Sequence, residues 1–163
     1  MTLAAADKVL TLDRLLEKLG PLRAAGKTVA LGNGLFDLIH VGHLRYLEGA
    51  SREADVLVVG VNADSTARAL KGPSRPVIPE TERAELVAGF GCVDWVTIFS
   101  DMDVGPLLRA IRPCVHCKGT DYTVETVPER EIARELGIRT VIVGDPKTHA
   151  SRELIQRIRS GQG

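Results

Sequence analysis

The sequence contains little cysteine, few aromatic side chains and no excess of charge of either sign. Its 163 residues include three cysteines, and aromatic residues make up 4% of the chain. An odd, small number of cysteines argues against a disulfide framework and predicts free thiols. Basic and acidic residues number 21 each, so the chain lacks the basic excess typical of proteins that bind a phosphate backbone. We therefore expect no nucleic acid partner.

Long apolar runs are also missing. No run reaches the ~18 residues that span a bilayer, and the first residues, Met1 to Asp7, lack the basic and apolar stretches of an export signal. We therefore expect a cytoplasmic protein that has no membrane partner. The length fits a single domain, in which a helical lead-in at 1–26 precedes the core at 27–160.

Apolar runs of strand length alternate with stretches of helical period along the chain. This alternation predicts an α/β fold with a doubly wound, Rossmann-like, five-stranded parallel sheet. The strands are expected at 28–31, 55–61, 93–99, 114–118 and 139–143. The helices are expected at 12–24, 41–53, 65–70, 79–90, 104–111, 128–136 and 151–159.

Short polar segments follow four of these predicted strands, at 32–37, 62–64, 119–121 and 144–146. Open parallel sheets bind ligands beyond the carboxyl ends of their strands, so these segments are the expected site. The one clearly irregular stretch runs from Lys71 to Pro76. Its basic residues make it a candidate active-site loop.

Two glycine patterns imitate nucleotide-binding motifs, and neither fits. Gly26-Lys27-Thr28 resembles the end of a P-loop, but five residues separate it from Gly20 where the motif requires four, and it leads into a strand instead of a helix. Gly32-Asn33-Gly34 resembles the start of a dinucleotide fingerprint, but Asp37 occupies the third glycine position.

A stronger signal lies between the first predicted strand and the helix at 41–53. His40 and His43 are three residues apart, which at a helix start would place them on one face beside free backbone N–H groups. Gly42 leaves room for a phosphate there, and Gly34 lets the preceding loop approach it. Imidazoles can donate hydrogen bonds to the charge that grows on a transferring phosphoryl group. The alternative, a helix cap and a surface residue, fits two histidines around a glycine less well.

The stretch Gly34-x-Phe36-Asp37-x-x-His40-x-Gly42-His43 resembles the signature of the HxGH cytidylyltransferase-like nucleotidyltransferases. Nearly the whole chain is similar to the heptose-1-phosphate adenylyltransferase domain of bacterial bifunctional heptose enzymes. The similar segments are Gly26-Lys27, Arg45-Tyr46-Leu47, Val61-Asn62-x-Asp64, Leu70-Lys71-Gly72-Pro73-x-Arg75-Pro76, Glu82-Arg83, Cys92-Val93-Asp94-Trp95-Val96 and Lys118-Gly119-x-Asp121-Tyr122.

Carried over by position, this resemblance implies roles for individual residues. His40 and His43 would bind triphosphate oxygens and stabilise the transition state, while Lys71 would bring mobile positive charge. Arg75 and Arg83 would anchor the acceptor phosphate, although a solvated surface charge is an equally good interpretation of either alone. The implied nucleotide-binding residues are Asn33, Gly34, Leu35, Phe36, Asp37, Gly42, Gly119, Asp121 and Ser151.

The chain departs from the family near its end. Where family members have an Ile-Ser-Thr-Thr-like segment that contacts phosphates, this chain has His149-Ala150-Ser151-Arg152. Ser151 can still cap the last helix and donate to a phosphate, and Arg152 or His149 is a candidate replacement for the lost hydroxyl. Class I aminoacyl-tRNA synthetases share the HxGH chemistry, but this chain is short and neutral and has no Lys-Met-Ser-Lys-Ser-like loop.

The Cys114-Val115-His116-Cys117 segment resembles a metal or redox pair. Strand alternation would place its two cysteines on opposite faces, and no second ligand pair is present. We therefore expect both cysteines to pack in the core and no protein metal site.

The resemblance implies an enzyme that transfers AMP from ATP to a sugar 1-phosphate and releases pyrophosphate. The leading acceptor is D-glycero-D-manno-heptose 1-phosphate, Mg²⁺ would bind with the NTP, and the enzyme would be a homodimer. A cytidylyltransferase acting on glycerol-3-phosphate or another polyol phosphate is the alternative within the superfamily. From another class, a catalytically weak nucleotide-binding regulator stays open.

Overall fold

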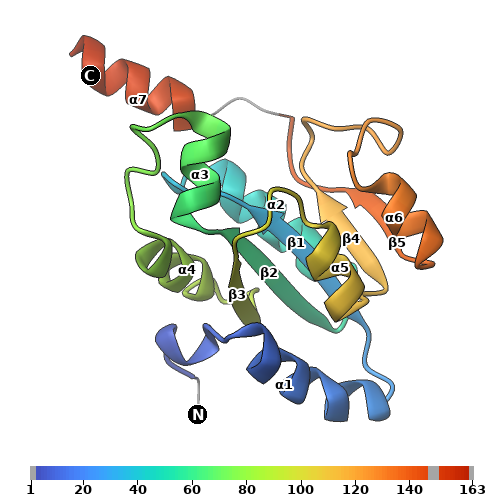
Figure 1. Cartoon of the computed structure of the whole chain (residues 1–163). Coiled ribbons are helices and arrows are strands. Elements are labelled where there is room, and N and C mark those ends of the chain that lie inside the picture. The colour runs from blue at the N-terminus through green and yellow to red at the C-terminus, as the bar shows by residue number, and fades with distance from the viewer. Residues whose placement is uncertain (1–2, 147–150, 162–163) are drawn as a thin grey trace.

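The computed structural model describes residues 3–146 and 151–161, and its centre is a five-stranded parallel sheet (Figure 1). The strands are β1 (Val29–Gly34), β2 (Val56–Asn62), β3 (Trp95–Phe99), β4 (Val115–Lys118) and β5 (Arg139–Ile142). Their order across the sheet is β3-β2-β1-β4-β5. The predicted Rossmann-like α/β fold is confirmed, with small shifts in the strand ends.

The helices cover both faces of the sheet (Figure 1). They are η1 (Ala6–Lys8), α1 (Leu12–Ala24), α2 (Val41–Ser51), α3 (Asp64–Lys71), α4 (Glu80–Ala88), α5 (Gly105–Ile111), α6 (Arg130–Glu135) and α7 (Ser151–Ser160). Successive strand residues point to opposite faces. Ala30 and Leu57 therefore pack with α2 and α4, whereas Leu31 and Val58 pack with α1 and α5.

The N-terminal segment is an integral part of this fold. Leu15 and Leu19 of α1 are fully buried against the sheet, and Thr11 caps the helix by accepting from the Arg14 N–H at 3.4 Å. The Leu10 N–H donates to the Val96 carbonyl at 2.8 Å, so the chain before α1 adds to the edge at β3. The short helix η1 precedes this contact and has no counterpart among the predicted elements.

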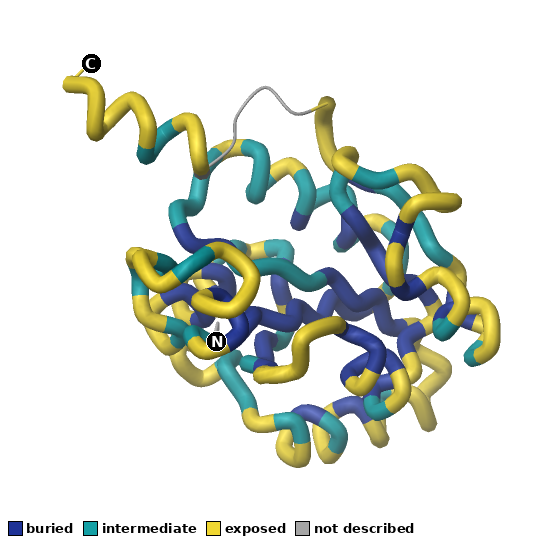
Figure 2. Tube along the Cα trace, turned by 45° about the horizontal axis from the view of Figure 1, so that its top comes forward, coloured by how far each residue is buried: buried dark blue, intermediate teal, exposed yellow. Residues whose placement is uncertain are grey.

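Burial differs sharply between the sheet and the last helix. Figure 2 shows the strands buried at the centre, while α7 projects from the body and is exposed along most of its length. Among residues 3–146 and 151–161, no helix has both the length and the apolar character needed to cross a membrane.

The strand order positions the site. The chain adds β2 and β3 on one side of β1, then returns to place β4 on the other side. Ligands of open α/β sheets bind at this reversal, beyond the carboxyl ends of the two strands that flank it. The segments that follow β1 and β4 therefore face one crevice.

Candidate active site

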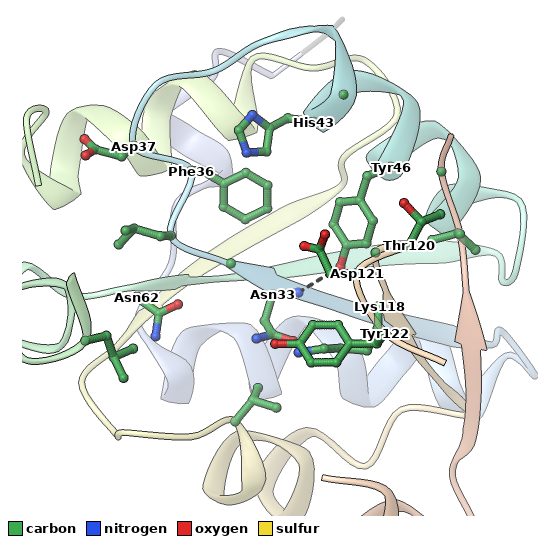
Figure 3. Close-up of a pocket in the computed structure, with 18 of the residues that line it drawn as sticks. Asn33, Phe36, Asp37, His43, Tyr46, Asn62, Lys118, Thr120, Asp121 and Tyr122 are labelled. Atoms are coloured by element: carbon green, nitrogen blue, oxygen red, sulfur yellow. Dashed lines mark hydrogen bonds between the residues drawn. The ribbon is translucent and has the colours of Figure 1, made fainter. Parts of the chain in front are cut away.

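A cavity of about 890 Å³ opens at the carboxyl ends of β1 and β4 (Figure 3). We call it the main cavity. Its wall includes most of the residues predicted for the site: Asn33, Gly34, Leu35, Phe36, Asp37, His40, Gly42, His43, Lys71, Arg75, Gly119 and Asp121. It also includes residues that sequence reasoning did not assign, among them Tyr46, Asn62, Lys118, Tyr122, Glu129 and Asp145.

His40 and His43 form a reciprocal cap at the start of α2, with their ring centroids 4.0 Å apart. Nδ1 of His40 accepts from the Gly42 N–H at 3.1 Å, and Nδ1 of His43 accepts from the His40 N–H at 3.2 Å. Because Nδ1 accepts in each ring, the proton of each neutral imidazole is on Nε2. Both rings thus carry a directed Nε2–H donor at the wall of the cavity.

This arrangement corrects one expectation about the helix start. Free backbone N–H groups were expected at the start of this helix, but the Gly42 N–H donates to the His40 ring and the His43 N–H donates to the His40 carbonyl at 2.9 Å. His40 therefore both caps α2 and lines the main cavity.

The Phe36 ring lies beneath His43 in the view of Figure 3. Its ring centroid lies 5.3 Å from that of His43, its side chain is buried, and its backbone has a φ of 51°. A Cβ placed on Gly34 would lie 3.0 Å from the Phe36 ring. Gly34 therefore lets this ring pack close to the backbone of β1.

Tyr46 connects α2 to two strands. Its hydroxyl donates to the Cys117 carbonyl of β4 at 2.8 Å and accepts from the Asn33 N–H of β1 at 3.2 Å. Burial raises the pKa of Tyr46 well above its usual value, so the hydroxyl stays protonated and can donate. A Cβ on Gly32 would lie 2.8 Å from this hydroxyl. Sequence reasoning missed Tyr46, whose only signal was the segment similar to the family.

Asn33 is held by a partner that is distant in sequence. Nε2 of His116 lies 2.9 Å from Oδ1 of Asn33. Burial, followed by the charge of Lys118, lowers the pKa of His116 to about 3, so this ring is neutral at pH 7. Its Nε2–H therefore donates to the amide oxygen, which leaves the Asn33 amide nitrogen for a ligand in the cavity.

Asp37 reaches the cavity wall, but its carboxylate is already engaged. One oxygen accepts from Arg75 Nε at 2.6 Å, and the other accepts from the Val77 and Ile78 N–H groups at 2.8 and 3.0 Å. A carboxylate in this position would also repel a phosphate. The carboxylate of Asp37 thus anchors the loop that follows α3, and the nucleotide contact implied by the resemblance stays a prediction.

Arg83 is likewise misassigned as an anchor of the acceptor. Its side chain is fully buried. The guanidinium donates to the Ile78 carbonyl at 2.8 Å, to Oδ1 of Asp64 at 2.7 Å and to the Leu35 carbonyl. Through these three hydrogen bonds Arg83 joins α4 to the chain that follows β1 and β2. The structure thus gives Arg83 a supporting role behind the site.

Lys71 and Arg75 face both the main cavity and a second cavity of about 300 Å³. Lys71 is the last residue of α3, which Gly72 ends with a φ of 99°. The second cavity is also lined by Ser74 and by one face of α7, comprising Arg152, Ile155, Gln156 and Arg159. Basic side chains from two parts of the chain therefore meet there.

The predicted residues at the start of α7 are only partly described. The helix begins at Ser151 as predicted, and Arg152 lines both cavities. His149, Ala150 and the Ser151 side chain lie outside the described residues.

The two cysteines of the fourth strand region differ in environment. Cys117 is buried, and burial raises the pKa of its thiol to about 12. Cys114 is exposed, so the prediction that both pack in the core is wrong for Cys114, which lies just before β4. In the part of the chain that the structure describes, no group of three His, Cys, Asp or Glu side chains could hold a metal ion.

Comparisons with known proteins identify the family of the chain. Residues 31–159 match the family model described as cytidylyltransferase-like. The chain is 40% identical to the bifunctional protein HldE of Syntrophotalea carbinolica, over 93% of this chain and 31% of that protein. It is also 40% identical to HldE of Desulfatibacillum aliphaticivorans, over 99% of this chain and 33% of that protein. The chain thus spans about a third of the length of these curated relatives.

A solved structure shares the fold. The lipopolysaccharide core biosynthesis protein from Thermoplasma volcanium matches with a TM-score of 0.64 and 25% identity, over 75% of this chain and 100% of that one. Together with the family model, this match confirms the relationship that the segment from Gly34 to His43 predicted. The chain belongs to the cytidylyltransferase-like family of nucleotidyltransferases.

Proposed function

We propose that the chain transfers a nucleoside monophosphate, AMP from ATP, to a sugar 1-phosphate and releases pyrophosphate. The leading acceptor is D-glycero-D-manno-heptose 1-phosphate, in keeping with the similarity to HldE proteins. The proposal rests on the paired rings of His40 and His43, whose Nδ1 atoms are held by the helix cap and whose Nε2–H donors lie at the cavity wall.

The reaction is an in-line displacement. An ionised oxygen of the acceptor phosphate attacks the α-phosphorus, a new P–O bond forms, and the bond from the α-phosphorus to the oxygen bridging the β-phosphorus breaks. Because the attacking oxygen is already ionised, no general base is required. Catalysis then depends on positioning and on donors aimed at the developing charge, which the two histidines supply.

Positive charge for the acceptor comes from the loop after α3. Arg75 is fixed by Asp37 through Nε, and Lys71 is exposed at the helix end, where it can follow the phosphate. Arg152 adds a further cation on the wall of the same cavity, where family members have a hydroxyl. These three side chains would neutralise the phosphates as they approach one another.

Mg²⁺ would enter with the NTP. The described side chains provide no group of three metal ligands, and the Asp37 carboxylate is occupied by the loop. Mg²⁺ is commonly held by substrate phosphates and water with few protein ligands, and this donor set fits that mode. We also propose a homodimer acting in the cytoplasm, as the family resemblance implies, and sedimentation of the purified protein tests the dimer.

The test is a substrate panel with pyrophosphate release as the signal. The four common NTPs are each combined with several sugar 1-phosphates and polyol phosphates in the presence of Mg²⁺. We expect the highest kcat/KM for ATP with heptose 1-phosphate. CTP with glycerol-3-phosphate as the best pair would instead identify the cytidylyltransferase alternative. NTP binding without pyrophosphate release in any combination would identify a regulator and contradict the proposal.

A further inference from the structure

A pair of buried charges lines the main cavity at the end of β4, apart from the histidines. Lys118 is the last residue of β4, and Glu129 immediately precedes α6. Each residue is only 8% exposed, and both belong to the cavity wall. In Figure 3, Lys118 and Tyr122 occupy the lower part of the view, away from His43 at the top. No role in the proposed phosphate chemistry uses these residues.

The two charges do not satisfy one another. Lys118 Nζ lies 3.7 Å from Glu129 Oε2, which is beyond hydrogen-bond distance. That carboxylate oxygen is buried and finds no hydrogen-bond donor among the residues the structure describes. A buried carboxylate oxygen without a donor is costly. The pair therefore includes an acceptor atom without a donor, in a carboxylate whose residue lines the main cavity.

The ammonium is also constrained by its surroundings. Lys118 Nζ lies 4.7 Å from the centre of the Tyr122 ring. Burial lowers the pKa of Lys118, while the Glu129 carboxylate opposes that shift. The Lys118 ammonium, a hydrogen-bond donor, thus lies beside the Glu129 carboxylate, an acceptor, and next to the half-buried ring of Tyr122.

The chemistry of the pair selects one kind of group. A phosphate would suit Lys118 but be repelled by Glu129, and an amine cation would suit Glu129 but be repelled by Lys118. A hydroxyl is uncharged, donates one hydrogen bond and accepts others. It can donate to the Glu129 carboxylate while it accepts from Lys118 Nζ.

We propose that Lys118 and Glu129 together recognise a hydroxyl group of a sugar bound in the main cavity. The inference rests on the proposed function, because a nucleotide and a sugar phosphate are the ligands that would bring such hydroxyls there. The hydroxyl belongs either to the ribose of the NTP or to the acceptor sugar. Tyr122 offers its ring as an adjacent apolar surface for the carbon skeleton of that sugar.

The experiment measures discrimination between hydroxylated ligands and their deoxy analogues. Calorimetry gives the Kd of the wild-type protein for ATP, 2′-deoxy-ATP and 3′-deoxy-ATP with Mg²⁺. Steady-state assays give the kcat/KM for the best acceptor of the substrate panel and for its monodeoxy analogues. We expect one analogue in one arm to be weaker by about 10- to 100-fold, the effect of losing a hydrogen bond to a charged group. A weaker deoxy-ATP identifies the ribose of the NTP as the source of the hydroxyl, and a weaker deoxy acceptor identifies the acceptor sugar.

Two variants test the residues. The double variant Lys118→Met/Glu129→Leu replaces both charges with apolar side chains, which avoids leaving a buried unpaired charge. It should bind the deoxy and hydroxylated ligands within about twofold of each other, because neither partner of the hydroxyl remains. The single variant Glu129→Gln keeps the shape and should reduce the discrimination partially. Circular dichroism checks that both variants are folded.

The matched control uses the exposed ion pair of the same helix, Glu131 with Arg134. Glu131→Leu/Arg134→Met should keep the wild-type discrimination. A wild-type protein that binds ATP but rejects no deoxy analogue in either arm would overturn the inference. So would wild-type discrimination between hydroxylated and deoxy ligands in the folded Lys118→Met/Glu129→Leu and Glu129→Gln variants. Failure of the wild type to bind any nucleotide would instead overturn the proposed function, and this inference with it.

Discussion

Nε2 of His116 lies 2.9 Å from Oδ1 of Asn33, so a fully buried ring on β4 holds an amide at the carboxyl end of β1. The two residues are 83 positions apart in the chain. Because the His116 ring donates to the amide oxygen of Asn33, the amide nitrogen is the group that Asn33 presents to the cavity. Asn33 can then donate to a phosphate or hydroxyl oxygen, whereas the opposite amide orientation would present an oxygen to anionic ligands.

Replacing His116 should therefore weaken substrate binding through Asn33. We expect His116→Leu to raise the KM for NTP by about fivefold, since one hydrogen bond contributes about 1 kcal/mol, with a smaller change in kcat. His116→Gln retains a donor that can reach the amide and should restore part of the loss. Steady-state kinetics of both variants measure this. Equal KM values for wild type and a folded His116→Leu variant would remove the positioning role.

The same histidine predicts a pH dependence of stability. Burial lowers the pKa of His116 in the folded protein to about 3, whereas an unfolded histidine has a pKa of about 6.5. Between these values the unfolded state binds the proton and the folded state does not. The stabilising contribution is thus complete above pH ~6.5 and is lost as pH falls toward ~3, by up to about 1.4 kcal/mol per pH unit.

Urea unfolding from pH 7 to pH 4 measures this effect. Carboxylates also titrate in the lower part of this range, so the comparison is with His116→Leu, in which they are unchanged. The free energy of unfolding should fall less steeply in His116→Leu than in the wild type. Parallel curves for the two proteins would show that His116 accepts a proton in the folded state.

His43 has two functions, a helix cap through Nδ1 and a donor to phosphate through Nε2, and two substitutions can separate them. Its Nδ1 accepts from the His40 N–H in the helix cap, and its Nε2 is the donor assigned to the transferring phosphate. His43→Asn retains an acceptor near Nδ1 and should preserve stability while lowering kcat by ~10²-fold, the typical effect of losing one transition-state donor. His43→Gln places a donor nearer Nε2 and should retain more activity.

The His43→Gln variant should also be less stable than His43→Asn by about 1 kcal/mol, because it loses the cap. Kinetics with the true substrate pair and thermal unfolding measure the two effects. His43→Ala should show both losses, with kcat affected more than the KM for NTP. A folded His43→Ala variant with near wild-type turnover would contradict the proposed mechanism.

Arg75 and Arg83 should respond differently to the same substitution. Arg83→Met should destabilise the fold by about 3 kcal/mol or more, because it removes a buried cation and leaves Asp64 and two carbonyls without their donor. Arg75→Met should also lower the stability, because the buried Asp37 carboxylate loses its cation, but by less than Arg83→Met, since that carboxylate keeps the Val77 and Ile78 N–H donors. It should in addition raise the KM for the acceptor. Thermal unfolding and acceptor titrations give both values. A stable Arg83→Met variant with a specific acceptor defect would restore the role originally predicted for Arg83.

Much of the fold was predictable from the sequence because it depends on local patterns. Apolar runs in β1 and β2 alternate with helical periods, and this is sufficient to predict a parallel α/β sheet. The segment from Gly34 to His43 was recognisable because its residues lie within one turn and one helix start. Even there the sequence did not predict that the His40 ring would accept from the Gly42 N–H and the His43 ring from the His40 N–H.

The pairing of distant charged and polar groups was decided only by the tertiary structure. Arg75 and Arg83 look alike in sequence, yet one lies at a cavity wall and the other is enclosed by three acceptors. The partners of Asp37, Asn33 and Glu129 come from other elements, and no periodicity relates them. By itself the sequence determined which segments become strands and helices and where the histidines stand, because those properties depend on neighbours in the chain. The tertiary structure decided which polar groups hydrogen-bond to one another and which can bind a ligand, since that depends on the strand order and on burial.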